Sequence, residues 1–108
     1  MKQSTAMILD FEDEDFLVEV ETIKTGEDEI TSIWVLYDTD LEKIMELNGT
    51  YTMNQASNPF YIEDVIDSII SIIKTRIFLY RYNFESEHDL IESNDACIMR
   101  KYMEYVSL

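Results

Sequence analysis

The chain has 108 residues, of which 46% are apolar, a composition that suits one globular domain and argues against a disordered acidic tail. Its 23 acidic and 8 basic residues give a net charge of −15, which excludes direct binding to nucleic acid or to anionic membranes. No apolar signal core precedes Asp10, and the longest apolar run, residues 69–73, is too short to span a membrane. Cys97 is the only cysteine and cannot form a disulfide within the chain, which fits a reducing compartment. We therefore expect a cytoplasmic protein.

The first third of the chain has the alternation of apolar and polar residues that is typical of β-strands. Residues 5–11, 16–24 and 29–37 each alternate in this way, and short turn-forming segments separate them. The third of these strands is apolar on both faces, so it either lies in the centre of the sheet or turns Trp34 toward a partner. We favour a Trp34 that is covered by its own chain, and keep partner contact as the alternative.

Residues 39–54 predict a short helix followed by a strand. Thr39 and Glu42 have the spacing of a capping box, in which the hydroxyl and the carboxylate each bind a free backbone amide. Gly49 is suited to ending such a helix. The segment Thr50–Asn54 has the composition of a short edge strand.

A long central helix is predicted after this segment. Asn58 and Pro59 form a helix start, because the asparagine side chain caps free N–H groups and proline fits the first helical position. Apolar residues then recur at helical spacing to about Tyr82. Residues 76–84 also suit a strand, but no glycine or proline separates them from the helix, so we predict one continuous helix.

The last predicted element is a helix over residues 87–105. Ser86 begins a second capping box, and the apolar spacing that follows would bury Leu90, Ile91, Cys97, Ile98 and Tyr102. A buried Cys97 is expected to be part of the core rather than a reactive thiol.

Together these elements predict one α+β domain over residues 1–108. Its β-meander, over residues 5–37, would be an antiparallel sheet of three to four strands at the N-terminus. Its helical part, residues 39–105, would contribute two or three helices packed on one face of that sheet.

The acidic residues are concentrated in the first half of the chain. Residues 1–46 hold 14 acids and 3 bases, whereas residues 47–108 hold 9 acids and 5 bases. Solubility alone requires no such concentration. In the predicted meander the acids lie at both ends of the second strand and along one of its faces, and this stripe suits the Lys and Arg side chains of a partner. The residues that we predict to bind a partner are Glu12, Asp13, Glu14, Asp15, Glu19, Glu21, Glu27, Asp28, Glu29 and Trp34.

Other kinds of site fit the sequence less well. Carboxylates at a wet hairpin tip lack the partly dry pocket that acid–base catalysis needs, so we expect no catalytic residue and no enzyme. The run Asp10–Asp15 is rich in oxygen ligands but lacks the glycine and the final glutamate of a calcium-binding loop. One His and one Cys make no zinc site, and two glycines make no phosphate-binding loop. We therefore expect neither a metal nor a cofactor.

These observations predict a small acidic inhibitor that binds a basic nucleic-acid-handling protein and masks its site. It would act as a nucleic-acid mimic, either as a phage or mobile-element anti-defence protein or as an immunity protein that neutralises a toxin. The alternative is a non-enzymatic structural or adaptor domain that forms a homodimer through its helices, with acidity serving solubility. A monomer or a homodimer is compatible with the inhibitor.

Overall fold

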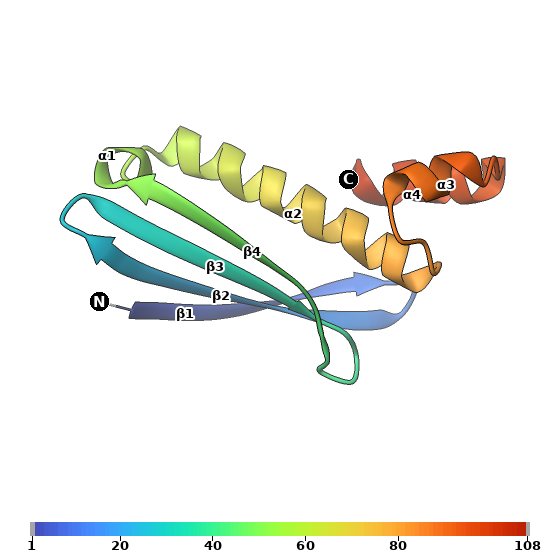
Figure 1. The fold of residues 1–108 in the computed structure, drawn as a ribbon, viewed down its shortest axis with the longest axis horizontal. Coiled ribbons are helices and arrows are strands. Elements are labelled where there is room, and N and C mark those ends of the chain that lie inside the picture. Colours follow the sequence, from blue (N-terminus) through green and yellow to red (C-terminus); the bar gives the residue numbers. More distant parts are fainter. Residues whose placement is uncertain (1, 108) are drawn as a thin grey trace. The chain divides into compact units, whose positions relative to one another are not determined.

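A computed structural model describes residues 2–107, which form four strands followed by four helices (Figure 1). The strands are β1 (Lys2–Phe11), β2 (Glu14–Gly26), β3 (Glu29–Tyr37) and β4 (Lys43–Thr52), and they pair antiparallel in the order β1-β2-β3-β4. The helices are α1 (Met53–Ala56), α2 (Pro59–Arg81), α3 (Glu87–Glu92) and α4 (Ala96–Val106). The predicted α+β class and the N-terminal antiparallel meander are therefore confirmed.

The chain divides into two compact units, one up to Val65 and one from Ile66 onward. The first unit contains the sheet, α1 and the beginning of α2, and the second contains the rest of α2 with α3 and α4. Helix α2 continues through the boundary without a break. The candidate site described below lies entirely in the first unit.

β1 and β2 form a hairpin whose turn consists of two residues, Glu12 and Asp13. Both have a positive φ, 51° and 64°, as the type I′ turn that joins adjacent antiparallel strands requires. The pairing then runs from Phe11–Glu14 at the turn to Lys2–Ile23. The predicted hairpin with an acidic tip is confirmed, and its strands are longer than the alternation indicated.

The buried residues of the sheet come from one of its faces. Phe16 and Val18 of β2 and Leu36 of β3 are fully buried, and Trp34 is 6% exposed. Val18 lies directly opposite Leu36, and side chains alternate along a strand, so all four project to the same side. We call this side the apolar face.

The predicted helix that begins at Thr39 is wrong, because residues 43–52 form β4. β3 is apolar on both faces and lies inside the sheet, so it needs a strand on each side. β4 is the second of these strands and places Leu47 directly opposite Trp34. Strand pairing thus overrides the local capping-box signal, and the strand predicted over Thr50–Asn54 covers only the end of β4.

Asp38, rather than the predicted cap at Thr39, holds the turn between β3 and β4. Its side chain is 5% exposed, and its Oδ1 accepts hydrogen bonds from the backbone N–H groups of Asp40 and Glu42, each at 2.9 Å. Leu41 takes a positive φ of 63° between them. An aspartate that accepts hydrogen bonds from the amides two and four residues ahead stabilises a turn, and this turn leads the chain back along β3 as β4. A helix cap at Thr39 would instead have started a helix.

Replacing Asp38 with alanine is expected to lower the free energy of unfolding by about 1–3 kcal/mol, because two turn amides lose their acceptor. The Asp38→Asn variant retains an acceptor oxygen and should keep most of the stability. Urea denaturation followed by Trp34 fluorescence measures the difference. The exposed Asp40→Ala control is expected to change stability by less than about 0.5 kcal/mol, and an equal loss in Asp38→Ala and Asp40→Ala would contradict the assignment.

Helix α2 agrees with its predicted start and length. The Asn58 side chain accepts hydrogen bonds from the backbone N–H groups of Phe60 and Tyr61 at 3.0 and 3.3 Å. The helix continues to Arg81, so residues 76–81 are helical rather than a strand. None of the helices within residues 2–107 combines the length and the apolar character needed to cross a membrane.

The helix predicted over residues 87–105 is interrupted. Asn94 has a positive φ of 52°. Asp95 caps the start of α4, because its Oδ1 accepts a hydrogen bond from the backbone N–H of Cys97 at 3.0 Å. Leu90 is fully buried as predicted, whereas Ile91 and Cys97, which were also predicted to be buried, are exposed. The prediction of a buried Cys97 is wrong because the break changes the helical phase between α3 and α4.

Candidate partner-binding site

The side of the sheet opposite the apolar face carries acidic side chains from all four strands. Ala6 lies opposite Glu19, Glu19 opposite Val35, and Val35 opposite Glu46, so these residues share one side. We call this surface the acidic face. By the same register its members are Lys2, Ser4, Ala6, Ile8, Asp10, Asp15, Leu17, Glu19, Glu21, Ile23, Glu29, Thr31, Ile33, Val35, Tyr37, Lys43, Glu46, Asn48, Thr50 and Thr52.

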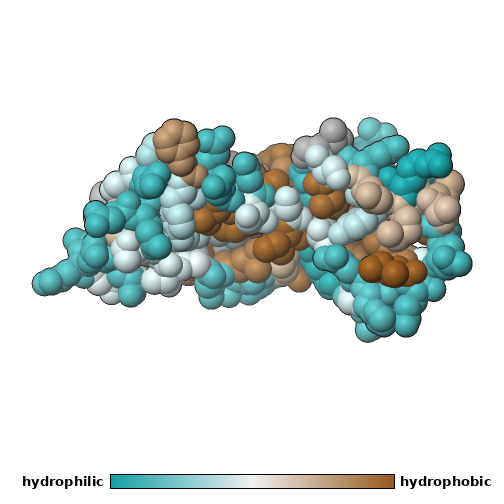
Figure 2. All heavy atoms as spheres, turned by 90° about the horizontal axis from the view of Figure 1, so that it is seen from above, coloured by the Kyte–Doolittle hydropathy of each residue, from teal (hydrophilic) through white to brown (hydrophobic). Residues whose placement is uncertain are grey.

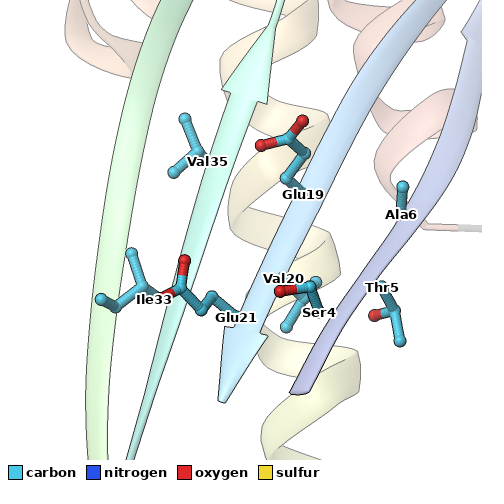
Figure 3. A pocket seen from close by; sticks show the side chains of 8 residues that line it. All are labelled: Ser4, Thr5, Ala6, Glu19, Val20, Glu21, Ile33 and Val35. Carbon is cyan, nitrogen blue, oxygen red and sulfur yellow. The ribbon is translucent and has the colours of Figure 1, made fainter. Parts of the chain in front are cut away.

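A hollow of about 350 Å³ lies in the acidic face (Figure 3). Figure 3 shows Glu19 and Glu21 of β2 beside Val35 and Ile33 of β3, with Ala6 of β1 on the other side. Two residues along a strand separate the carboxylates by about 7 Å. An arginine or lysine suits this arrangement, because its aliphatic stem can pack on the apolar side chains while its charged end meets a carboxylate.

Two lysines of the same face neutralise only part of its charge. Lys2 Nζ lies 3.1 Å from Glu21 Oε1, and Lys43 Nζ lies 3.3 Å from Glu46 Oε1. Both pairs are largely exposed to solvent, so each contributes at most about 1 kcal/mol. The basic side chain of a partner can therefore displace either lysine at little cost.

Tyr37 places a hydrogen-bond donor on the acidic face. Its OH donates to Glu19 Oε2 at 3.4 Å. Partial desolvation raises the pKa of Tyr37, and the negative charge of Glu19 raises it further. The phenol therefore stays protonated at neutral pH and holds the Glu19 carboxylate beside the hollow.

Four of the predicted binding residues lie together on the acidic face. Asp15, Glu19 and Glu21 project from β2, and Glu29 lies at the far end of the face. The hydroxyl of Thr25 donates a hydrogen bond to Glu29 Oε1 at 2.7 Å. The stripe of charge predicted along the second strand thus has a counterpart in the structure.

Four others lie in the turns at the two ends of β2. Glu12 and Asp13 form the first turn, and Glu27 and Asp28 form the second. The backbone N–H of Met53 donates to Asp28 Oδ1 at 3.2 Å, so Asp28 also holds the start of α1. These four acids extend the charge beyond the ends of the acidic face.

The remaining two predicted residues, Glu14 and Trp34, lie on the opposite side of the sheet. Glu14 pairs with Phe11 and therefore alternates with Asp15 to the apolar face. Trp34 is buried on that face, which favours the interpretation in which its own chain covers it. The structure does not bring either side chain to the acidic face.

Asp10 and Asp15 lie directly opposite each other at the hairpin end of the acidic face. Partial desolvation raises the pKa of Asp10 above its ordinary value of 3.8, and a side-chain hydrogen bond with Asp15 and the charge of Asp15 raise it further. A negative charge beside a carboxyl group disfavours loss of its proton, so Asp10 holds its proton more tightly than an isolated aspartate does. The same pair would attract a cation from a partner.

The Asp15→Asn variant is expected to lower the pKa of Asp10 toward 3.8, because the neighbouring negative charge is removed. The folded-state pKa of Asp10 lies above the unfolded value, so Asp10 makes the fold more stable as the pH falls through the raised pKa toward 3.8. Asp15→Asn should reduce this gain in acid. An NMR titration of the Asp10 carboxyl measures the pKa, and urea denaturation at several pH values measures the stability, with Asp67→Asn as a distant control. An unchanged titration in Asp15→Asn would show that the pair does not interact.

Sequence reasoning missed three residues of the acidic face: Asp10, Tyr37 and Glu46. The alternation that predicts the first strand does place Asp10 on the same side as Ala6 and Ile8, but its position opposite Asp15 follows from the two-residue turn. Glu46 could not be placed on the sheet because its segment was wrongly predicted to be a helix. Tyr37 could be placed on its strand but not beside Glu19, because that contact depends on strand register.

Within residues 2–107, no three His, Cys, Asp or Glu side chains come together in an arrangement that could hold a metal ion. His88 is exposed and lies 3.0 Å from Glu92 on α3. The chemistry that the acidic face offers is that of hydrogen-bond acceptors and negative charge beside a partly apolar hollow.

Comparison with known proteins does not place the chain in a family. No family model, no curated protein and no solved structure matches it. The function proposed below therefore rests on the geometry and the charge of the acidic face.

Proposed function

We propose that this chain is a small acidic inhibitor that binds a basic nucleic-acid-handling protein and masks its site. The observation that carries the proposal is the acidic face, where two carboxylates of β2 line a hollow beside apolar side chains on an open sheet surface. Lysine and arginine side chains that hold phosphates in a nucleic-acid groove would meet hydrogen-bond acceptors here instead. The inhibitor would then compete with nucleic acid for the same groove.

The first turn supports a role in binding. Type I′ turns favour Asn and Gly, yet this chain places Glu12 and Asp13 there, both at positive φ. A left-handed backbone costs an ordinary L residue about 1–2 kcal/mol, although aspartate tolerates it better than glutamate does. Strain of this kind is concentrated at functional positions in proteins. Two acids at the turn extend the charged surface toward a partner where Asn-Gly would have given a more relaxed turn.

Two biological settings fit such an inhibitor. A phage or mobile-element protein would oppose a host defence nuclease, and an immunity protein would neutralise a cognate toxin. In both settings the inhibitor would act in the cytoplasm on a protein with a basic groove, and electrostatic attraction would speed their association.

The second candidate function is a structural or adaptor domain that acts through its helices. Ile72, Ile91 and Met103 are 48%, 61% and 61% exposed, and Figure 2 shows apolar residues in separate patches among hydrophilic ones. Apolar side chains that are exposed singly are common on proteins and need no partner. The acidic face therefore supports the inhibitor more strongly than these residues support the adaptor.

The test of the inhibitor is capture of its partner from a lysate of the organism that encodes it, followed by identification of the captured protein. We expect a basic protein that handles nucleic acid, and we expect the purified chain to reduce its activity. Binding should weaken as the salt concentration rises from about 0.05 M to about 0.5 M, because exposed charges are screened. A captured protein without a basic surface, or binding that salt does not change, would contradict the proposal.

A further inference from the structure

β1 lies at an edge of the sheet and has a neighbouring strand on one side only. Its pairing with β2 has no register shift, whereas the β2–β3 and β3–β4 pairings each contain one. Residues 2–6 are exposed, and so are Ile8 and Asp10. A long, regular edge with neither proline nor bulge is a template to which another strand can add.

The first turn fixes which residues of β1 offer backbone groups at the open edge. In a hairpin closed by a two-residue turn, the residues that flank the turn, here Phe11 and Glu14, form a hydrogen-bonded pair. Such pairs alternate along the strands, so the odd-numbered residues of β1 direct their N–H and C=O groups toward β2. The backbone groups of the even-numbered residues, from Lys2 to Asp10, therefore point away from the sheet.

The charged residues of β1 are placed so that two antiparallel copies of the strand bring opposite charges together. Lys2 is the basic residue of β1 and Asp10 the acidic one, and residues 3–9 between them are uncharged. Both charged side chains belong to the acidic face. In a chain with a net charge of −15, this uncharged stretch lets a second copy approach the edge without like charges directly opposite it.

We propose that β1 pairs antiparallel with β1 of a second copy of this chain, with Ala6 opposite the partner's Ala6 and Lys2 opposite the partner's Asp10. This register sets every outward-facing residue of one strand opposite an outward-facing residue of the other. A shift by two residues in either direction keeps that match but leaves strand ends unpaired and separates the lysine from the aspartate. Opposite charges that face each other across strands favour the unshifted register.

The same register gives Asp10 a cationic neighbour. In a single chain Asp10 faces Asp15, whose charge contributes to the raised pKa of Asp10. The partner's Lys2 would exchange its exposed ion pair with Glu21 of its own chain for these two carboxylates and offset their repulsion. The two sheets would join into one, and the two β2 strands would run about 14 Å apart, at three strand spacings. The dimer would thus present two acidic faces side by side.

Cysteine crosslinking tests the register. In a Cys97→Ser background, the Ala6→Cys variant places the two Cα atoms about 5.5 Å apart, which is within the range of a disulfide. Mild oxidation is expected to convert most of this variant to a covalent dimer. The matched Ser4→Cys variant places its Cα atoms about 14 Å apart and should remain monomeric. Equal crosslinking of the two variants, or no crosslinking of Ala6→Cys, would overturn the proposal.

Loss of one outward-facing amide tests the edge itself. The Ala6→Pro variant removes an N–H that points away from β2, a position where edge strands tolerate proline. Sedimentation of the full chain between about 1 μM and about 1 mM is expected to show a monomer–dimer equilibrium, since a single strand pairing buries little area. Ala6→Pro should raise the dissociation constant at least tenfold, with circular dichroism confirming the fold. A chain that is monomeric throughout, or a dimer that Ala6→Pro leaves unchanged, would refute the edge pairing.

Exchange of charges provides a test that does not depend on proline. Asp10→Lys alone should weaken the dimer, and addition of Lys2→Asp should restore it, because the opposite pair is re-formed in the same register. No rescue would contradict the proposed register. These experiments use the chain without any other protein, so their failure would leave the inhibitor proposal standing. Glu19→Lys alone should leave the dimer intact.

Discussion

A chain in which Glu19 and Glu21 are both replaced by lysine is expected to bind its basic partner at least about 100-fold more weakly. Removing one member of a desolvated, hydrogen-bonded charge pair costs about 2–5 kcal/mol, and about 2.7 kcal/mol corresponds to 100-fold in affinity. Both residues line the hollow of the acidic face, where a partner's Lys or Arg would be held. The new lysines would also repel that side chain.

The double reversal should leave the fold intact. Glu19 is exposed, and Glu21 gives up only its exposed ion pair with Lys2, which contributes at most about 1 kcal/mol. The hydrogen bond from Tyr37 to Glu19 is also at the surface. Far-UV circular dichroism and Trp34 fluorescence should therefore match those of the unaltered chain, so that a loss of binding can be assigned to the acidic face.

A matched control separates the acidic face from net charge. Glu63 and Asp67 are exposed acids of α2, and replacing both with lysine changes the net charge from −15 to −11, as the double reversal does. Binding of the captured partner to each variant is measured at one salt concentration. We expect the α2 variant to bind within about threefold of the unaltered chain, because screening weakens charges that lie away from a contact. Equal losses would assign the effect to net charge, and undiminished binding after the double reversal would favour the adaptor.

Most of the sheet could be predicted because its strands alternate regularly. The apolar residues of β2 and β3 recur at every second position, which fixes the face to which Phe16, Val18 and Leu36 project. The same alternation placed Glu19 and Glu21 together on the other face. Periodicity therefore sufficed for the part of the candidate site that lies on one strand.

The rest of the site depends on which strands are neighbours. The capping-box spacing of Thr39 and Glu42 is a local signal, whereas β4 forms because β3 needs a strand on its second side. Glu46 reaches the acidic face only through this pairing, and Asp10 meets Asp15 only through the two-residue turn. A single sequence does not specify such long-range pairings, so the hollow and its width could not be derived from it.

Residues 76–84 show how a local ambiguity is resolved by packing. Their aromatic residues suit a strand or a helix, but α2 continues to Arg81. Phe78 and Tyr82 are four residues apart and stack with ring centroids 4.6 Å apart, as neighbours on one side of a helix do. Tyr102 of α4 meets Phe78 edge-on at 5.3 Å. Phe78 is therefore the aromatic centre of the second unit.

Replacing Phe78 with alanine is expected to lower the free energy of unfolding by about 3–5 kcal/mol. The side chain is fully buried, and truncation removes its apolar area and leaves a cavity between Tyr82 and Tyr102. The Tyr80→Ala control lies two residues away on the same helix and is 43% exposed, so it should cost less than about 1 kcal/mol. Urea denaturation followed by far-UV circular dichroism measures both losses. Similar losses in the two variants would show that Phe78 is not the centre of the packing.

The same experiment tests whether residues 1–108 form the predicted single domain. Trp34 is the only tryptophan and lies in the first unit, whereas the helical signal comes mainly from the second. Because α2 continues through the boundary at Val65, we expect cooperative unfolding, with Phe78→Ala lowering the fluorescence and circular dichroism midpoints together. A lower circular dichroism midpoint with an unchanged Trp34 midpoint would show two units that unfold independently, each with its own core.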